Sequence, residues 1–335
     1  MTADPVLVLA WLALAHLVAD FILQTNTMVA DKSHPGRRAW RGLTAHGGAV
    51  AACLAPFGLA FGSRGIALLV VITLSHVAID RWKVVATRRA EAGALAEAHR
   101  RHAGTGTTSG LGPAWTPAPG ALFIADQLAH GFVSFAAWLV LVAFIEPSTD
   151  FAAAVDRLLG PIDRSSFHVA TVVAVVVASL LIVNVRAAAM FVATLVHPRQ
   201  AVSGESELDV PAETRPARSW RFRLGPFVAT AEAPDPGEAV VSNAAGDDNV
   251  HLGYAPPARI GATIGVLERL LIVTLVLTNA TAAIGLVIGA KTLARFKQLD
   301  DRDFAEYYLL GTLASVGLAL GSALLADAAL ATVGL

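Results

Sequence analysis

Charge and cysteine are both scarce in this sequence of 335 residues. Charged side chains make up 15% of the chain, against about a quarter in an ordinary soluble domain. The single cysteine, Cys53, excludes an intrachain disulfide. The formal net charge of −1 provides no basic field that would favour nucleic acid as a partner. The sequence also lacks a phosphate-binding glycine loop, a G-x-S-x-G nucleophile motif and an H-E-x-x-H zinc motif, so the enzyme classes that these motifs identify are not indicated.

Apolar residues are in excess: 55% of the chain is hydrophobic and the mean hydropathy is +0.60. They occur in runs of roughly 20 residues, the length that crosses the hydrocarbon core of a bilayer. The first run has no Lys or Arg before it, and His16 and Asp20 interrupt it, so we predict a retained helix rather than a cleaved export signal. The sequence predicts an all-α integral membrane protein with about eight transmembrane helices, at 5–23, 43–61, 65–83, 119–145, 166–196, 259–279, 281–297 and 305–333. The seventh segment is short and contains glycine, which leaves open whether it spans the membrane or is re-entrant.

Basic residues alternate between rich and poor connections along the chain. Loops 24–42, 81–118 and 197–258 and the 291–302 region are rich in Lys and Arg, whereas the link after the second helix and the connection at 146–165 are poor or offset by acidic residues. The positive-inside rule then predicts a multi-pass protein of a bacterial inner membrane, with the basic loops in the cytoplasm and both termini outside.

The predicted organisation has four parts. Residues 1–145 form a four-helix membrane domain that carries most of the His and Asp side chains, and 146–196 form a connector and the fifth helix. Residues 197–258 are rich in Pro, Ala, Gly, Glu and Asp and are predicted to form a flexible cytoplasmic loop, as is the stretch 98–118. Residues 259–335 form the C-terminal membrane helices.

Ionisable side chains recur inside the first four predicted helices. The first and third helices share a His-x-x-x-Asp spacing and similar neighbours, which indicates a duplicated hairpin, and the fourth has the reversed spacing. Side chains four residues apart lie on one helical face, and the predicted topology places all of these groups at a similar depth near the cytoplasm. The residues are His16, Asp20, His46, His76, Asp80, Asp126 and His130.

Polar groups inside a membrane are costly and usually mark a functional site. Imidazole and carboxylate ligands without thiolate favour Zn, Mn or Fe(II), and seven candidate ligands would suffice for two ions. Two alternatives remain at this point: an interhelical hydrogen-bond network and a proton or ion pathway.

Flanking polar residues are candidates for substrate contacts. In the first half these are Gln24, Lys32, Lys83 and Gln127, although Lys83 also suits an interfacial anchor. In the second half, Lys291 and Arg295 would form a cationic rim that suits an anionic lipid headgroup, or else interhelical salt bridges. Glu268 and Arg269 are adjacent near mid-membrane and need separate partners, and Arg186 is the expected partner of Glu268.

The first 145 residues resemble a bacterial membrane family known as domain of unknown function 3307. The resemblance rests on the motifs His16-x-x-x-Asp20-Phe21-x-Leu23-Gln24, His76-x-x-x-Asp80-x-x-Lys83 and Asp126-Gln127-x-x-His130, with Lys32 and His46. The segment Ile264-Gly265-x-Leu267-Glu268-Arg269 and the motifs after it resemble the C-terminal region of longer members. The resemblance implies no activity.

The residues themselves favour a metal-dependent membrane hydrolase that acts on an amphiphilic or phosphorylated substrate at the cytoplasmic leaflet. Asp80, Asp126 and His130 are the candidate catalytic groups within the metal-ligand set. A transporter or channel that uses the same cluster as an ion or proton site is the alternative, since transporters are often built from repeats. A membrane scaffold without catalytic activity is a third hypothesis.

Overall fold

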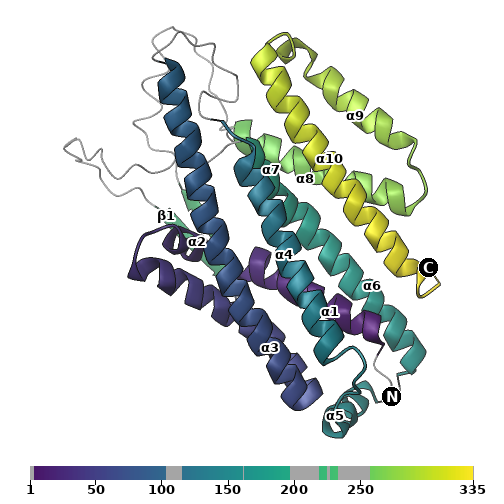
Figure 1. The fold of residues 1–335 in the computed structure, drawn as a ribbon. Coiled ribbons are helices and arrows are strands. Elements are labelled where there is room, and N and C mark those ends of the chain that lie inside the picture. The colour runs from purple at the N-terminus through teal and green to yellow at the C-terminus, as the bar shows by residue number, and fades with distance from the viewer. Residues whose placement is uncertain are drawn as a thin grey trace. The chain divides into compact units, whose positions relative to one another are not determined.

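The computed structural model describes residues 4–102, 115–160, 162–196, 219–224, 227–232 and 257–334. The chain forms two units, Met1–Ala201 with Ala258–Leu335, and Val202–Pro257. The described part of the first unit is helical, and the second contains a pair of strands (Figure 1).

The first predicted span is confirmed as α1 (Pro5–Val18) followed by a π-helical turn, η1 (Ala19–Leu23). Asp4 begins α1 as its N-cap, because its carboxylate accepts the backbone N–H of Val6 at 2.9 Å. A short helix that the sequence did not predict, α2 (Asn26–Lys32), follows and packs against α3. It places Lys32 in a buried position.

The second and third predicted spans are the two arms of α3 (Arg37–His102). The chain reverses at Gly62, whose φ of 56° and ψ of −131° suit only glycine. As a result, His46 Nε2 lies 2.9 Å from His76 Nε2, whereas 30 residues of straight helix would separate them by about 45 Å. A Cβ atom at Gly65 would lie 1.9 Å from the carbonyl oxygen of Phe57, so the close approach of the arms also requires glycine there. The second arm continues past the predicted end at residue 83.

The next helices follow the predicted fourth and fifth spans. They are α4 (Ala118–Leu141), then α6 (Arg164–Ile182), a π-helical turn η2 (Val183–Ala187) and α7 (Ala188–Val196). The predicted connector contains a further helix, α5 (Thr149–Leu159), which Ser148 caps. Asp163 caps α6, and hydrogen bonds from Ser165 Oγ and the backbone N–H of Ser166 hold the pKa of its carboxyl below the usual value.

The C-terminal helices are α8 (Pro257–Leu277), α9 (Ala283–Ala294) and α10 (Arg302–Ala331), with a short 3₁₀ turn η3 (Phe296–Gln298) before α10. Helix α9 has 12 residues, so it is about 18 Å long and shorter than a hydrocarbon core of about 30 Å. The predicted seventh span is therefore not a full-length transmembrane helix. Side chains of α8, α9 and α10 share one apolar core, which includes Ile272, Ile284 and Val316.

Two short strands lie within the segment 197–258, for which the sequence predicts a flexible loop. β1 (Ser219–Leu224) and β2 (Phe227–Glu232) pair antiparallel, with Ser219 opposite Glu232 and Leu224 opposite Phe227. The rest of that loop before Pro257 lies outside the described residues, as do residues 103–114 of the other predicted linker.

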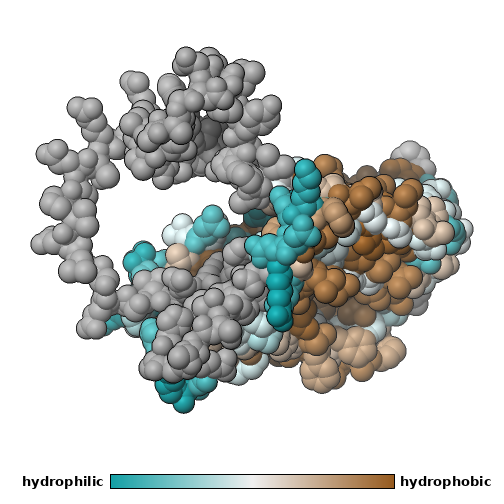
Figure 2. Space-filling view, turned by 90° about the horizontal axis from the view of Figure 1, so that it is seen from above, coloured by the Kyte–Doolittle hydropathy of each residue, from teal (hydrophilic) through white to brown (hydrophobic). Residues whose placement is uncertain are grey.

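The described helices have the length and surface of a multi-pass membrane protein. Among the described residues, five helices are long and apolar enough to cross a bilayer: Pro5–Leu23, Arg37–Arg100, Ala118–Leu141, Ser165–Val196 and Phe304–Ala331. The second of these contains both arms of α3. Large apolar side chains such as Phe132, Val140 and Phe144 are exposed, and hydrophobic residues cover much of the surface that Figure 2 shows. Such a surface fits a lipid environment.

Candidate metal centre

The structure brings together all seven His and Asp residues that the sequence singled out. The α1–η1 segment supplies His16 and Asp20, the first arm of α3 supplies His46, the second arm supplies His76 and Asp80, and α4 supplies Asp126 and His130. Six of the seven are buried, and His16 is half-buried. The shared depth inferred from the charge pattern is therefore seen as a direct juxtaposition of side chains.

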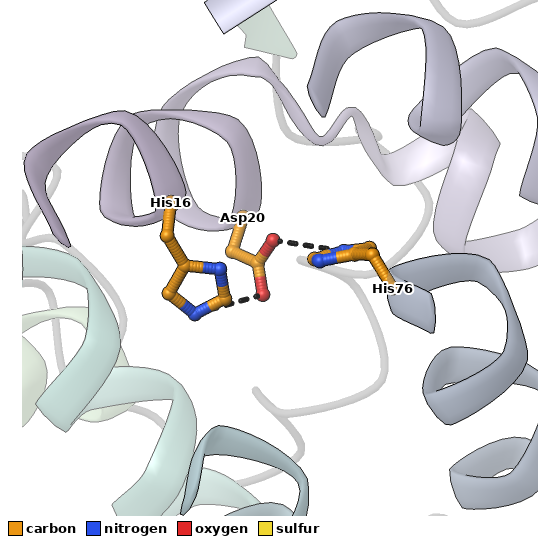
Figure 3. Close-up of side chains that lie close together, drawn as sticks. All are labelled: His16, Asp20 and His76. Carbon is orange, nitrogen blue, oxygen red and sulfur yellow. Dashed lines mark ion pairs between the residues drawn. The ribbon is translucent and has the colours of Figure 1, made fainter. Parts of the chain in front are cut away.

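Asp20 lies between imidazoles from two helices (Figure 3). Its Oδ1 atom is 3.3 Å from Nε2 of His76 and 3.3 Å from Nε2 of His46. Its Oδ2 atom is 3.8 Å from Nε2 of His16, one turn earlier on the same helix. A carboxylate with three imidazole nitrogens around it has the composition of a transition-metal ligand set.

The second arm of α3 extends the cluster away from Asp20. Asp80 Oδ2 is 3.7 Å from His46 Nε2 and 3.9 Å from His76 Nε2. The rings of His76 and His130 stack with their centroids 4.0 Å apart, and His130 Nδ1 is 3.7 Å from Asp126 Oδ1. His76 thus lies at the middle of the cluster.

Three overlapping groups of side chains could each hold a metal ion, because their ligand atoms lie within 4.8 Å of one another. Asp80 belongs to two of them and His76 to two. The groups are His16–Asp20–His76, His46–His76–Asp80 and Asp80–Asp126–His130.

Four buried atoms of the cluster have no hydrogen-bond partner among the described residues, which supports a role as metal ligands. They are Asp20 Oδ1, His46 Nδ1, Asp126 Oδ1 and His130 Nδ1. A buried polar atom without a partner costs free energy, about 1–3 kcal/mol in typical cases. A divalent ion in the cluster would give the carboxylate oxygens Asp20 Oδ1 and Asp126 Oδ1 a partner, so these residues fit the group that they are proposed to hold; His46 faces the cluster through Nε2 instead.

The four flanking residues that the sequence singled out in this half also touch the cluster. Lys32 Nζ donates to Asp80 Oδ2, and Lys83 Nζ donates to Asp126 Oδ2 at 2.7 Å. Gln127 Nε2 donates to Asp126 Oδ2 at 3.1 Å, and its Oε1 lies 3.2 Å from His16 Nε2. With its amide in the orientation that satisfies both groups, Gln24 donates to the carbonyl oxygen of Asp20 and accepts from Lys32. These contacts orient the candidate ligands; whether the same residues also touch substrate stays a prediction.

The predicted cationic rim has its own partners. Lys291 Nζ donates to Glu268 Oε2 at 2.6 Å and lies over the ring of Tyr308, while Arg295 donates to Gln298 at 3.3 Å. A groove of about 240 Å³ lies beside the Lys291–Glu268 pair, with otherwise apolar walls formed by Ile264, Leu267, Leu271 and Val287. The groove combines an apolar surface with an ion pair, as an amphiphile requires.

The expected pairing of Glu268 with Arg186 was wrong. Helix α9 places Lys291 beside Glu268, whereas Arg186 Nε donates to the carbonyl oxygen of Phe21 at 3.3 Å. Arg269 has separate partners, as predicted: the carbonyl oxygen of Asn184 and Ser315 Oγ. No sequence pattern predicted the contact of Arg186 with Phe21; the available signal was a cation isolated in a long apolar run.

Comparisons with known proteins identify the first half of the chain. Residues 8–158 match the family model described as Protein of unknown function (DUF3307). The match includes every residue of the His/Asp cluster and ends before α6. No curated protein and no solved structure matches the chain.

Proposed function

Residues 8–158 match the DUF3307 family, whose function is unknown, and we propose, from the residues of the site, that the chain is a metal-dependent hydrolase of the bacterial inner membrane. Its substrate would be an amphiphilic or phosphorylated molecule at the cytoplasmic leaflet. The observation that carries the proposal is the convergence of seven His and Asp side chains from four helical segments, six of them buried in a membrane protein. Placing ionisable groups inside a bilayer costs free energy, and such groups usually mark a functional site.

Two adjacent ions fit the arrangement best. The group around Asp20 and the group around Asp126 share no residue. The third group, His46–His76–Asp80, shares His76 with the first and Asp80 with the second. A divalent pair, when bound, would polarise a phosphate ester and lower the pKa of an attacking water. Zn, Mn and Fe(II) all accept this mixture of imidazole and carboxylate.

Side chains of the cluster would transfer the protons of the reaction and contact the substrate. Asp126 and His130, with Asp80, would accept the proton from water and return it to the leaving oxygen. Lys83 stands at the edge of the cluster, over the ring of Phe123, with its side chain 27% exposed. That partly exposed position suits contact with an anionic substrate.

The C-terminal groove supports an amphiphilic substrate. Its apolar walls would hold a hydrocarbon chain, and Lys291 and Arg295 would lie near an anionic group. The orientation of the protein, with both termini outside, rests on the basic loops and belongs to the same proposal.

A transporter is the second candidate, and the packing of the imidazole rings favours it. His16 lies 5.1 Å from His130 and 5.6 Å from His76 between ring centroids, and His46 lies 4.9 Å from His76. Imidazoles this close form a route along which a proton could pass. Metal-dependent release of phosphate by the purified protein separates the two functions.

The decisive experiment measures metal content by elemental analysis of the detergent-purified protein and of a His76→Ala variant. We expect the wild type to hold one or two equivalents of a transition metal and the variant to lose most of it, because His76 belongs to two of the three ligand groups. His168→Ala is the matched control. Among the described residues, the one ion pair of His168 is with Asp4, at 3.4 Å, and it does not involve the cluster. Metal-free wild type, with His76→Ala merely less stable, would show that the cluster is an interhelical network.

Manganese- or zinc-dependent phosphate release from dioleoyl phosphatidic acid in detergent micelles tests the hydrolase itself. We expect release by the wild type and the His168→Ala control, and none by Asp126→Asn. Uptake of protons into proteoliposomes without any hydrolysis would instead support the transporter.

A further inference from the structure

Arg186 is a cation without a counter-charge inside an apolar span. It lies in the segment Ser165–Val196, the most apolar of the candidate membrane spans, and its side chain is exposed. No described carboxylate forms an ion pair with it. A charged side chain inside a bilayer is costly and usually faces a cavity or a partner.

Within the described part of the chain, its guanidinium makes one hydrogen bond, to the backbone next to a candidate ligand of the cluster. Nε donates to the carbonyl oxygen of Phe21 at 3.3 Å, and Phe21 directly follows Asp20. Both residues belong to π-helical turns, η2 and η1, which contact each other. A π-helical turn breaks the regular α-helical hydrogen bonding of the backbone and is frequent at functional sites.

The backbone around Arg186 is held from the other side. Arg269 Nε donates to the carbonyl oxygen of Asn184 at 2.7 Å, within the same turn η2. Asn184 is itself fully buried and donates to Ser322 Oγ at 3.0 Å. The position from which the Arg186 side chain extends is therefore fixed by helices α8 and α10, which lie outside the family match.

The terminal nitrogens Nη1 and Nη2 of Arg186 make no hydrogen bond with a described residue. A guanidinium presents paired donors in one plane, which matches two oxygens of a phosphate. The neighbouring cations of the cluster differ, because Lys32 and Lys83 each hold a carboxylate. Arg186 thus has unused donors beside the centre.

We propose that Arg186 binds the phosphate group of the substrate beside the His/Asp centre. This inference rests on the proposed function and adds to it the chemical class of the bound group and the residue that recognises it. It also gives the C-terminal half a role, since α6, α7, α8 and α10 hold the recognising residue against a site built by the family domain.

The test is binding by isothermal titration to the full-length protein in detergent. The probes are dihexanoyl phosphatidic acid and, separately, inorganic phosphate. Arg186→Gln should weaken binding of the phosphatidic acid by about 10–100-fold, because a charge-assisted pair of hydrogen bonds is lost. Arg186→Lys should have a smaller effect, since it keeps the charge and loses the planar fork. Metal content and the absorption spectrum of the cobalt-substituted protein should not change.

Arg157→Gln is the matched control. Arg157 is also exposed and its Nε also donates to a backbone carbonyl, that of Ala153 at 3.2 Å, but it lies in α5. It should bind both probes as the wild type does.

Unchanged affinity in Arg186→Gln would overturn the inference. So would loss of binding together with an altered cobalt spectrum, because Arg186 would then act only on Asp20 through the Phe21 carbonyl. If Arg186→Gln weakened the binding of inorganic phosphate and of phosphatidic acid by the same factor, the result would support the site and assign it to free phosphate rather than a lipid headgroup. A metal-free protein whose phosphatidic acid binding still depends on Arg186 would end the hydrolase proposal and leave this inference standing.

Discussion

Two lysines compensate the charge of the buried carboxylates in the cluster. Asp126 is fully buried and Asp80 nearly so, and each accepts a hydrogen bond from one lysine, Lys83 and Lys32 respectively. Removing one partner of a buried ion pair leaves an uncompensated charge, which is far more costly than breaking a surface pair. These lysines therefore contribute to stability whether or not they also touch substrate.

The difference in cost between breaking a buried and a surface ion pair gives a prediction for Lys83→Met. We expect the variant to lose up to about 3 kcal/mol of stability because the Asp126 carboxylate loses its cation in a buried site. Thermal unfolding in detergent measures the change. Arg38→Met is the control, since Arg38 pairs with Asp31 with its side chain 58% exposed, and should change stability by about 1 kcal/mol or less. If Lys83→Met unfolded like the wild type and failed only to bind phosphatidic acid, Lys83 would be a substrate contact rather than a structural partner.

At the scale of elements, the reversal of α3 is the feature on which the site depends most. It places the first His-bearing arm beside the second, so that His46 and His76 meet across the hairpin. The π-helical turn η1 has a comparable effect on a smaller scale. Ala19, Asp20 and Phe21 are all buried, although consecutive side chains of a regular α-helix point about 100° apart. The wider turn allows Asp20 to face the cluster while Phe21 packs near Phe123.

Gly62→Ala should therefore separate the ligands as well as destabilise the fold. An alanine in this glycine-only conformation costs about 1–3 kcal/mol, and any relief by straightening the hairpin would move His46 away from His76. We expect a lower unfolding temperature and reduced metal content. Gly93→Ala in the same helix is the control: its added Cβ meets nothing within 4 Å, and alanine favours a helix by about 0.5–1 kcal/mol. Full metal content in Gly62→Ala would mean that the turn tolerates a side chain and does not set the ligand geometry.

At the scale of the molecule, contacts within the helical unit show which helix ends lie together; which side of the membrane they face stays a prediction. At one end, Asp4 lies 3.4 Å from His168, and the start of α1 and the end of α10 contribute Leu7 and Val333 to one apolar cluster. The start of α1 and the end of α10 thus lie at the same end of the unit, as the prediction of two external termini requires. The backbone N–H of Ser148 reaches the carbonyl oxygen of Ala60 near the α3 turn at 2.7 Å, so two predicted external connections also meet.

The opposite end gathers helix termini that adjoin the basic loops. Trp115 Nε1 donates to the carbonyl oxygen of Leu195 at 2.9 Å, which joins the start of α4 to the end of α7. Gly311 of α10 lies near Val196. The helix ends that adjoin the basic loops therefore lie together, at the end of the unit opposite to the start of α1.

Cysteine labelling of intact cells tests which end faces the cytoplasm. In a Cys53→Ser background, Arg100→Cys near the end of α3 should resist a membrane-impermeant thiol reagent, and Leu158→Cys in α5 should react. Both side chains are exposed, so a difference in labelling reports the membrane side rather than burial. Permeabilised cells, in which both should react, provide the control. Labelling of Arg100→Cys without permeabilisation would reverse the orientation and move the cluster toward the outer leaflet.

The sequence by itself determined the membrane class, most of the spans and the membership of the His/Asp cluster. These follow from local information: runs of apolar residues report a lipid environment, the i,i+4 spacing reports a shared helical face, and basic loops report one side. Even the separate partners of Glu268 and Arg269 follow from the angle between adjacent side chains.

Only the tertiary structure decided which groups meet across helices. The partner of Glu268 depends on where α9 places Lys291. The approach of Arg186 to Phe21 depends on two π-helical turns, which the periodicity of the sequence does not predict. Likewise, α2 and α5 are short, and their helical pattern competes with the loop composition around them. The packing of whole helices sets the distance between residues far apart in the sequence. Residue type and spacing therefore predicted the members of the His/Asp cluster but not the contacts that link it to the second half of the chain.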